Sequence, residues 1–405
     1  SYFSLFYLGI FSLIISILSF FNIIYSYYFN LYLNIDSYIY TLFISLILGF
    51  IFIIKKKDNY KISIYQKILT VVSGYFILPL IISIPLFFSI YNISFLDSYF
   101  ESISGFTSTG FSIFENIKHL DESLILWRSS SQWIGGLYFL FSIILLIDIF
   151  DDNLKKSLTN FLSFNTSELL KQSSKIFILY IILTICIFII FKIFDFRTFD
   201  SFNLAMTLIS SGGFIPSNSL STIVNTNGKE IIFSLLMLVS FFSILLNILI
   251  IIFFLFFNYD YNFSLTLLSL ISSISNIGIS LNNSPQNLSF IFLLLTIIGG
   301  SFFSTSSGIR FIKIYSLFKF SINDLISHVK PKNVFLNKNF FLNISFEKNE
   351  INKYFLSVLI FIISSLILTS ILTIFNISFE ISYKLSILTL MNTVNSSIHG
   401  LNDFN

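Results

Sequence analysis

The sequence is poor in charged residues, glycine and cysteine. Asp, Glu, Lys and Arg supply 11% of its 405 residues, against roughly 25% in an average soluble domain, which excludes an ordinary water-soluble globule. The single cysteine, Cys186, excludes an internal disulfide, and we expect it to be a small buried apolar side chain. The net charge of +3 is too small to favour nucleic acid as a partner.

The three histidines are far apart, and no acidic cluster or HExxH-like motif accompanies them. Such motifs would supply metal ligands, or a nucleophile together with its base. The sequence therefore predicts that the chain is not an enzyme.

Long apolar runs dominate the sequence instead. Hydrophobic residues make up 55% of the chain and aromatic residues 19%, and a helix needs about 20 apolar residues to cross a bilayer. The sequence predicts an all-α polytopic membrane protein, whose first run is a spanning helix and not a removed signal peptide. The runs lie at about 2–29, 38–54, 64–90, 124–149, 176–194, 229–257, 288–306 and 354–375.

Four shorter and more polar segments lie between these runs, at 97–109, 200–211, 263–276 and 383–397. They are too short to span a bilayer. Non-helical backbone at membrane depth is tolerated only inside protein or beside a water-filled cavity. We therefore expect each segment to be a helix that enters the membrane and turns back.

Basic residues indicate the orientation of the chain. Most of the 23 lysines and arginines fall in three clusters, at 55–67, 155–175 and 310–353. Loops rich in Lys and Arg stay in the cytoplasm. We therefore place these clusters in the cytoplasm and the chain in the cytoplasmic (inner) membrane, with the short helices entering from outside.

The order of span, short helix, turn and span recurs four times after two N-terminal helices. Four turns on one axis can offer rings of backbone carbonyls that replace the hydration shell of a monovalent cation, and glycine permits the carbonyl orientation. Most of the 15 glycines lie in these turns or in the helices that follow them. The predicted ion-binding filter comprises Thr107, Ser108, Thr109, Gly110, Ser210, Ser211, Gly212, Gly213, Ser275, Asn276, Ile277, Gly278, Asn395, Ser396, Ser397 and Ile398.

The repeat divides the chain into five parts. Gly110 and Gly212 are 102 residues apart, but Gly212 and Gly278 only 66, so we expect the first helix of the third repeat to be short or missing. The sequence ends five residues after Gly400, so we expect the last helix of the fourth repeat to be missing. The predicted parts are two transmembrane helices (1–60), three pore repeats (61–150, 151–257 and 258–320), and a cytoplasmic loop with the fourth repeat (321–405).

These segments resemble the Trk/Ktr/HKT superfamily of potassium transporters, in particular the bacterial Trk-type membrane pore subunit. Residues 100–111 are similar to that family's first pore helix and filter, 127–137 to the start of the following helix, and 328–334 to the cytoplasmic segment before the fourth unit. Residues 299–310 are similar to a Gly/Ser-rich break that forms an intramembrane gate. The resemblance implies a gate of Gly299, Gly300, Ser304, Thr305, Ser306, Ser307, Gly308 and Arg310.

The resemblance also implies a function. It implies potassium ion uptake through a central pore, by a symporter or a channel, with potassium held at the filter carbonyls. It implies a homodimer in the lipid bilayer and a cytoplasmic nucleotide-binding regulatory subunit. The chain itself has no glycine-rich phosphate loop, so nucleotide would bind that partner, and no organic cofactor is expected here.

The fourth turn departs from the family. Ile398 stands where the family usually has Gly, and His399 where Pro is common, and Ile disfavours a positive φ. Two alternatives therefore stay open: a pore permeable to sodium as well as potassium, and a non-conducting Trk-like paralogue or coupling subunit.

Four further residues or sets of residues carry expectations. Glu101 either concentrates cations at the mouth or fixes the filter loop through hydrogen bonds to backbone N–H groups. Arg310 lies either beside the pore or at a helix end, where its charge reaches the cytoplasm. We expect His399 to be solvated. The remaining set, expected to permit close helix packing, is Gly9, Gly49 and Gly74.

Overall fold

The computed structural model describes most of the chain. The described residues are 2–54, 63–146, 169–241, 263–281, 288–299, 305, 307–329, 348–393 and 399–401. Regular structure within them is almost entirely helical. The two strands in this part of the chain, β1 (Ile298–Gly299) and β2 (Ile309–Arg310), form one parallel pair.

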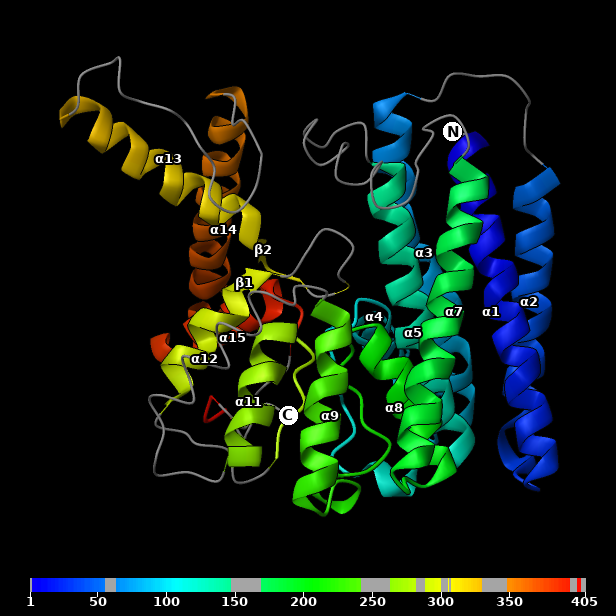
Figure 1. Cartoon of the computed structure of the whole chain (residues 1–405). Coiled ribbons are helices and arrows are strands. Elements are labelled where there is room, and N and C mark those ends of the chain that lie inside the picture. The colour runs from blue at the N-terminus through cyan, green and yellow to red at the C-terminus, as the bar shows by residue number, and fades with distance from the viewer. Residues whose placement is uncertain are drawn as a thin grey trace.

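Several helices are long enough to cross a bilayer, and they stand side by side (Figure 1). Large apolar side chains such as Phe76, Ile182 and Leu366 cover their outward faces, as expected where the surrounding solvent is lipid. Cys186 is exposed among them, which contradicts its predicted burial. Within the described residues the long apolar helical segments are Leu5–Tyr28, Tyr32–Ile54, Ile64–Ser89, Ser173–Ile193 and Ile351–Ile374.

The first two helices, α1 (Tyr2–Tyr28) and α2 (Ile35–Ile54), form an antiparallel pair joined by a single 3-10 turn, η1 (Tyr32–Asn34). They cross where Gly9 faces Gly49, since a Cβ at Gly9 would lie 2.9 Å from the Gly49 carbonyl oxygen. This contact agrees with the predicted packing role of both glycines.

The remaining helices form four units, as the sequence predicted. Their shared feature is a 12- or 13-residue helix, too short to span a bilayer, which we call the pore helix. The pore helices are α4 (Phe95–Phe106), α8 (Thr198–Ile209), α11 (Phe263–Ser275) and α15 (Phe379–Leu390). The other helices of the units are α3 (Ile64–Ser89), α5 (Glu122–Leu145), α7 (Leu169–Ile193), α9 (Asn227–Phe241), α12 (Ser289–Ile297), α13 (Phe311–Val329) and α14 (Lys348–Ile374).

The backbone repeats with a fixed spacing. In units one, two and four a residue with positive φ ends the entering helix, and a second one follows 16 positions later, just after the pore helix. These pairs are Asn92 with Ser108, Asp195 with Ser211, and Asn376 with Asn392. Asn, Asp and Ser tolerate the left-handed conformation better than bulkier residues. The repeat confirms the predicted architecture of four pseudo-symmetric units after two extra helices.

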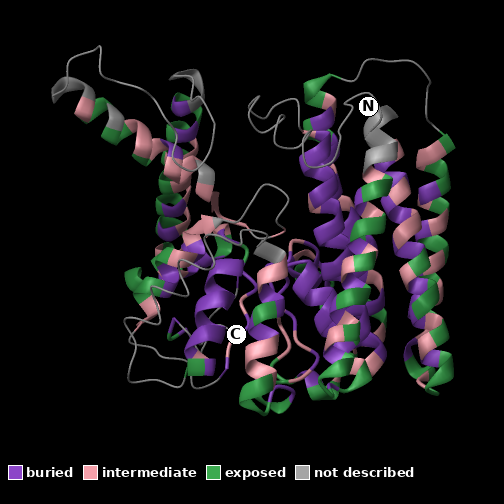
Figure 2. Ribbon diagram, viewed as in Figure 1, coloured by how far each residue is buried: buried purple, intermediate pink, exposed green. Residues whose placement is uncertain are grey.

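Nearly all residues of helix α5 are buried (Figure 2). Two of its anchors are hydrogen bonds: Trp127 Nε1 donates to the Ile82 carbonyl at 2.9 Å, and Tyr138 Oη donates to the Thr70 carbonyl at 2.8 Å. Gly74 allows the second contact, because a Cβ there would lie 1.9 Å from Tyr138 Oη. Helix α5 thus packs among α1 and the helices of the first two units.

Buried apolar residues form two clusters. The larger extends over the first three units and the N-terminal helix pair. The smaller belongs mainly to the fourth unit, where it joins α15 to α12, and it contains Leu293, Leu385, Ile387, Leu388, Met391 and Leu401. Residues 242–262, on which the predicted short third unit depends, lie outside the described residues.

Candidate ion pathway

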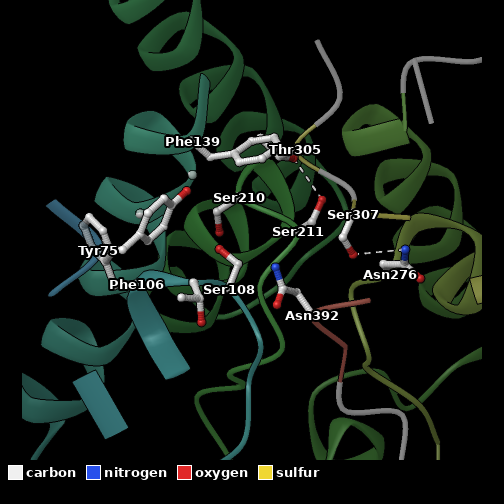
Figure 3. Close-up of a pocket in the computed structure, with 13 residues that line it drawn as sticks. Tyr75, Phe106, Ser108, Phe139, Ser210, Ser211, Asn276, Thr305, Ser307 and Asn392 are labelled. Atoms are coloured by element: carbon white, nitrogen blue, oxygen red, sulfur yellow. Dashed lines mark hydrogen bonds between the residues drawn. The ribbon is translucent and has the colours of Figure 1, made fainter. Parts of the chain in front are cut away.

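The four pore helices end around one cavity of about 130 Å³ (Figure 3). Each pore helix is followed by a residue with a left-handed backbone conformation, and this residue lines the cavity. These corner residues are Ser108, Ser211, Asn276 and Asn392, with φ between 47° and 57°. A helix C-terminus carries a partial negative charge. Four such ends around one cavity favour a cation there.

Three of the helix ends share the same hydrogen bond. The backbone N–H after the corner residue donates to a carbonyl five positions earlier: Thr109 to Ser104 at 2.9 Å, Gly212 to Thr207 at 2.8 Å, and Thr393 to Leu388 at 3.0 Å. This bond is typical of a helix that stops at a left-handed residue. It makes Asn392 the structural counterpart of Ser108.

The first three turns meet beyond the corner residues. A Cβ at Gly110, whose φ is +87°, would lie 2.7 Å from the Gly213 Cα. A Cβ at Gly213 would lie 3.2 Å from the Ile277 carbonyl oxygen and 3.6 Å from that of Thr109. Carbonyl oxygens of two turns therefore face the backbone of a third. Gly278 also has a positive φ, of 76°.

Gln132 of α5 fixes the direction of the second turn. With its amide oriented to suit its neighbours, the oxygen accepts from the backbone N–H groups of Gly213 and Phe214, both at 3.0 Å, and the nitrogen donates to Thr207 Oγ1 at 3.2 Å. In a trans peptide the N–H and the preceding C=O point in opposite directions. The carbonyls of Gly212 and Gly213 therefore point away from α5.

Glu101 and Arg128 form a buried ion pair behind the first turn. Their side chains are 0% and 2% exposed, and Arg128 Nη2 lies 2.8 Å from Glu101 Oε1. Glu101 Oε2 accepts from the Ile113 backbone N–H at 2.9 Å. Of the two roles considered for Glu101, the structure supports the one in which it fixes the filter loop.

Two residues of the predicted gate, Thr305 and Ser307, line the cavity. Thr305 Oγ1 donates to the Ile209 carbonyl at 3.0 Å and bonds the Ser211 hydroxyl at 2.9 Å. The second contact, and that between Asn276 and Ser307, are drawn in Figure 3.

Ser307 connects two more helix ends to this segment. Asn276 Nδ2 donates to Ser307 Oγ at 3.2 Å, and Ser307 Oγ donates to the Met391 carbonyl. The segment that follows α12 is therefore tied to α8, α11 and α15. Gly299 and Arg310 lie in the paired strands β1 and β2, and Gly308 has a φ of 96°. Three predicted gate residues, Gly300, Ser304 and Ser306, lie outside the described residues.

The fourth turn is described only at its start. The predicted filter residues Asn395, Ser396, Ser397 and Ile398 lie outside the described residues. The preceding residues show that α15 ends at Leu390 and that the corner is Asn392. Asn392 also approaches the first turn, since its Oδ1 accepts from Thr109 Oγ1 at 3.4 Å. Counted two residues on from each corner, position 394 corresponds to Gly110, and it too lies outside the described residues.

The other predicted filter residues divide into three groups. Thr107, Ser108, Ser210, Ser211 and Asn276 line the cavity. The residues at the contact between turns are Thr109, Gly110, Gly213 and Ile277. The remaining three lie elsewhere: Gly212 packs against Gln132, and Gly278 turns the backbone through a positive φ. The Ser275 hydroxyl instead donates within its own helix, to the Ile271 carbonyl at 2.8 Å.

Sequence reasoning missed several residues of the cavity wall. They come from the helices that pack around the turns, or from a different register of the fourth turn, and are Tyr75, Phe106, Gly135, Gly136, Phe139 and Asn392. The signal for Asn392 was the 16-residue spacing from Asn376. His399 is 1% exposed, which contradicts its expected solvation.

Comparisons with known proteins agree with this geometry. No family model matches the chain. The chain is 25% identical over 320 residues to an uncharacterised cation transporter of Methanocaldococcus jannaschii, which covers 71% of the chain and 66% of the relative. It is 21% identical over 281 residues to the Trk system potassium uptake protein TrkH of Halomonas elongata, covering 59% of the chain and 58% of the relative.

The crystal structure of the potassium transporter TrkH from Vibrio parahaemolyticus superposes with a TM-score of 0.76 at 16% sequence identity. The alignment covers 99% of this chain and 98% of that one. This chain has the TrkH fold. The resemblance to Trk-type transporters is thereby confirmed, and these relatives are named as transporters and not as enzymes. The chain spans less than two thirds of the length of these curated relatives.

Proposed function

We propose that this chain takes up potassium ions across the cytoplasmic membrane through the centre of the four units. The observation that carries the proposal is the convergence of four pore-helix ends on one cavity, with carbonyl oxygens of Thr109 and Ile277 directed at the contact between turns. The names of the relatives supply the ion: two are potassium transporters. The partially negative helix ends lower the cost of holding a dehydrated cation in the cavity.

The filter in this proposal is built from backbone. Potassium would lose water and bind carbonyl oxygens of the turns that begin at Ser108, Ser211, Asn276 and Asn392. The fourth turn of the filter would therefore lie four residues earlier than the sequence predicted, with position 394 rather than Ile398 as the counterpart of Gly110. Gln132 supports the arrangement, because it turns the Gly212 and Gly213 carbonyls away from α5.

The segment around Thr305 and Ser307 would act as a gate. Thr305 and Ser307 line the cavity and are held there by hydrogen bonds to three pore-helix ends. Such bonds are individually weak, so a modest change elsewhere could release the segment. The proposal includes a second copy of the chain and a cytoplasmic nucleotide-binding regulatory subunit as partners.

A glycine replacement tests the filter. In Gly110→Val the new Cβ would lie 2.7 Å from the Gly213 Cα, and the φ of +87° strains any residue with a side chain. We expect this variant to lose the ability to restore growth of a potassium-uptake-deficient bacterial strain on low potassium. Gly228→Val is the matched control, because a Cβ at Gly228 meets nothing within 4 Å. Growth equal to that of the unaltered chain would overturn the filter assignment.

One observation favours a pore that also admits sodium. Position 394, which corresponds to Gly110, Gly213 and Gly278, carries Val. Uptake of potassium and of sodium, each measured alone in liposomes, separates the two candidates. Equal initial rates would favour the sodium-permeable pore.

A further inference from the structure

Arg128 contacts both the first and the second filter turn from its place on α5. Its Nε donates to Glu101 Oε1 at 2.8 Å, and its Nη2 donates to Ser112 Oγ, two residues after Gly110, at 2.9 Å. The guanidinium carbon lies 4.1 Å from the centre of the Phe214 ring, and Phe214 directly follows Gly213. The Arg128 side chain thus contacts both the segment that follows the first turn and the segment that follows the second.

Glu101 binds the backbone of the segment that follows the first turn. Oε2 accepts from the Ile113 N–H at 2.9 Å, and Oε1 accepts from the Ser112 hydroxyl at 3.1 Å. The Ser112 carbonyl therefore points away from Glu101. A carboxylate with these donors and a guanidinium partner has a fixed orientation, since hydrogen bonds to charged groups are stronger than neutral ones.

The pair is confined to one unit. Glu101 lies seven positions before the corner residue Ser108, and the same position in the other units, counted from their corners, is occupied by Leu204, Ser269 and Leu385. A charge at this position is therefore not needed to end a pore helix. In the first unit it meets an arginine that reaches into the neighbouring unit.

Stability alone does not explain why this buried site holds an ion pair. Burying two charges is costly, and well-packed apolar residues often stabilise a protein at least as well. What an arginine adds is a planar group that bonds a carboxylate and stacks on an aromatic ring at the same time. Arg128 does both, with Glu101 on one turn and Phe214 on the next.

We propose that Glu101 and Arg128 are positioning residues for ion selectivity, which hold the first and second filter turns at a fixed separation. This inference rests on the proposed function. Neither residue touches the ion. The pair sets where the carbonyls of two adjacent turns stand, and selectivity depends on the number and placement of those oxygens.

Three variants separate selectivity from folding. Glu101→Gln keeps the side-chain length and an acceptor for the Ile113 N–H but removes the charge. Arg128→Lys keeps the charge but removes the planar group that stacks on Phe214. The double variant Glu101→Gln with Arg128→Gln leaves no unpaired buried charge. As a control, Arg197→Gln removes an ion pair of similar length, 2.6 Å to Glu122, in which both side chains are exposed at 65% and 37%.

The measurements are made on the purified chain. The first is the rise in melting temperature produced by potassium chloride compared with sodium chloride, which needs no transport. The second is the ratio of potassium to sodium uptake in liposomes. For each single variant we expect the ratio to fall roughly tenfold, the effect of one charged hydrogen bond, or about 1.4 kcal/mol. The double variant should have a higher melting temperature than Glu101→Gln, because it leaves no unpaired buried charge.

The outcomes are distinct. A lower melting temperature with an unchanged ratio in both single variants would show a merely structural pair and overturn the inference. A fall in the ratio in Arg197→Gln as large as in Arg128→Lys would overturn it too. If the unaltered chain shows no potassium preference in either measurement, the proposed function fails and the inference with it. If the unaltered chain prefers potassium and Glu101→Gln keeps that preference, the inference is overturned and the proposed function is not.

Discussion

Replacing Thr305 by valine should increase potassium flux in the absence of any partner. Valine has nearly the same shape as threonine but lacks the hydroxyl. The change removes the bond to the Ile209 carbonyl at 3.0 Å and the bond to the Ser211 hydroxyl at 2.9 Å. Two neutral hydrogen bonds are together worth about 1–3 kcal/mol, which corresponds to a factor of roughly 5 to 150 in an equilibrium.

That equilibrium is between a gate segment that is bonded to the pore-helix ends and one that has left them. If the bonded state closes the pore, the open fraction and the initial rate of potassium uptake into liposomes should rise by the same factor while the open fraction is small. Thr222→Val is the matched control. Thr222 also makes two hydrogen bonds, to Ser217 Oγ at 3.1 Å and to the Ser219 carbonyl at 2.8 Å, but in an exposed segment.

A fall in the uptake rate, or no change, in a Thr305→Val variant that keeps its melting temperature would refute the reasoning. The segment would then be part of the conducting pathway or irrelevant to it. An equal rise in the Thr222 control would show that loss of any such threonine increases leakage, and would refute it as well.

Two further predictions concern stability. Gly74→Ala should lower the melting temperature of the purified protein, because the added Cβ would lie 1.9 Å from Tyr138 Oη and overpacking typically costs about 1–3 kcal/mol; Gly228→Ala should not, and equal melting temperatures for the two would contradict the packing argument. Lys384, 2.6 Å away, lowers the pKa of Glu380 below its ordinary value of 4.5. The contribution of this pair to stability is therefore complete above about that pH and is lost as the pH falls through the lowered pKa. Because Glu380 is exposed, we expect Glu380→Gln to leave the melting temperature unchanged at pH 7, and a clear drop would show that the pair matters more than its exposure suggests.

The sequence allowed the fold to be predicted at the level of elements. The short helices were recognisable because 12 or 13 residues cannot cross a bilayer, and α4, α8, α11 and α15 all lie where short polar segments had been expected. Glycines located the first three turns, since Gly110, Gly213 and Gly278 lie where the backbones meet or turn through a positive φ.

The register of the fourth turn stays a prediction, because residues 395–398 lie outside the described residues. The prediction placed Ile398 where the family has glycine, whereas the repeated feature in the described residues is the corner residue, which is Ser or Asn in every unit. Asn tolerates the left-handed conformation, so glycine is not required there. The spacing from Asn376 could have located Asn392, but only with the 16-residue interval of the other units already known.

The wall of the cavity could not be predicted for a different reason. Tyr75, Gly135 and Phe139 line it from α3 and α5, which carry apolar residues along most of their length. In a membrane protein both the lipid and the protein interior are apolar, so hydrophobicity does not say which face points inward. The same ambiguity explains why Cys186 was expected inside and is found outside.

The division of the apolar core has a mechanical consequence for the ring of turns. Three corners stand on one packed body, and the fourth, at Asn392, stands on a smaller one that meets the rest through α12 and a few contacts such as Thr109 with Asn392. A packed body moves as a unit, because its interior resists compression. A force on the fourth unit would therefore move only the part of the pathway that is formed by Asn392. The opening would change in width in one direction, and the other three corner residues would stay in place.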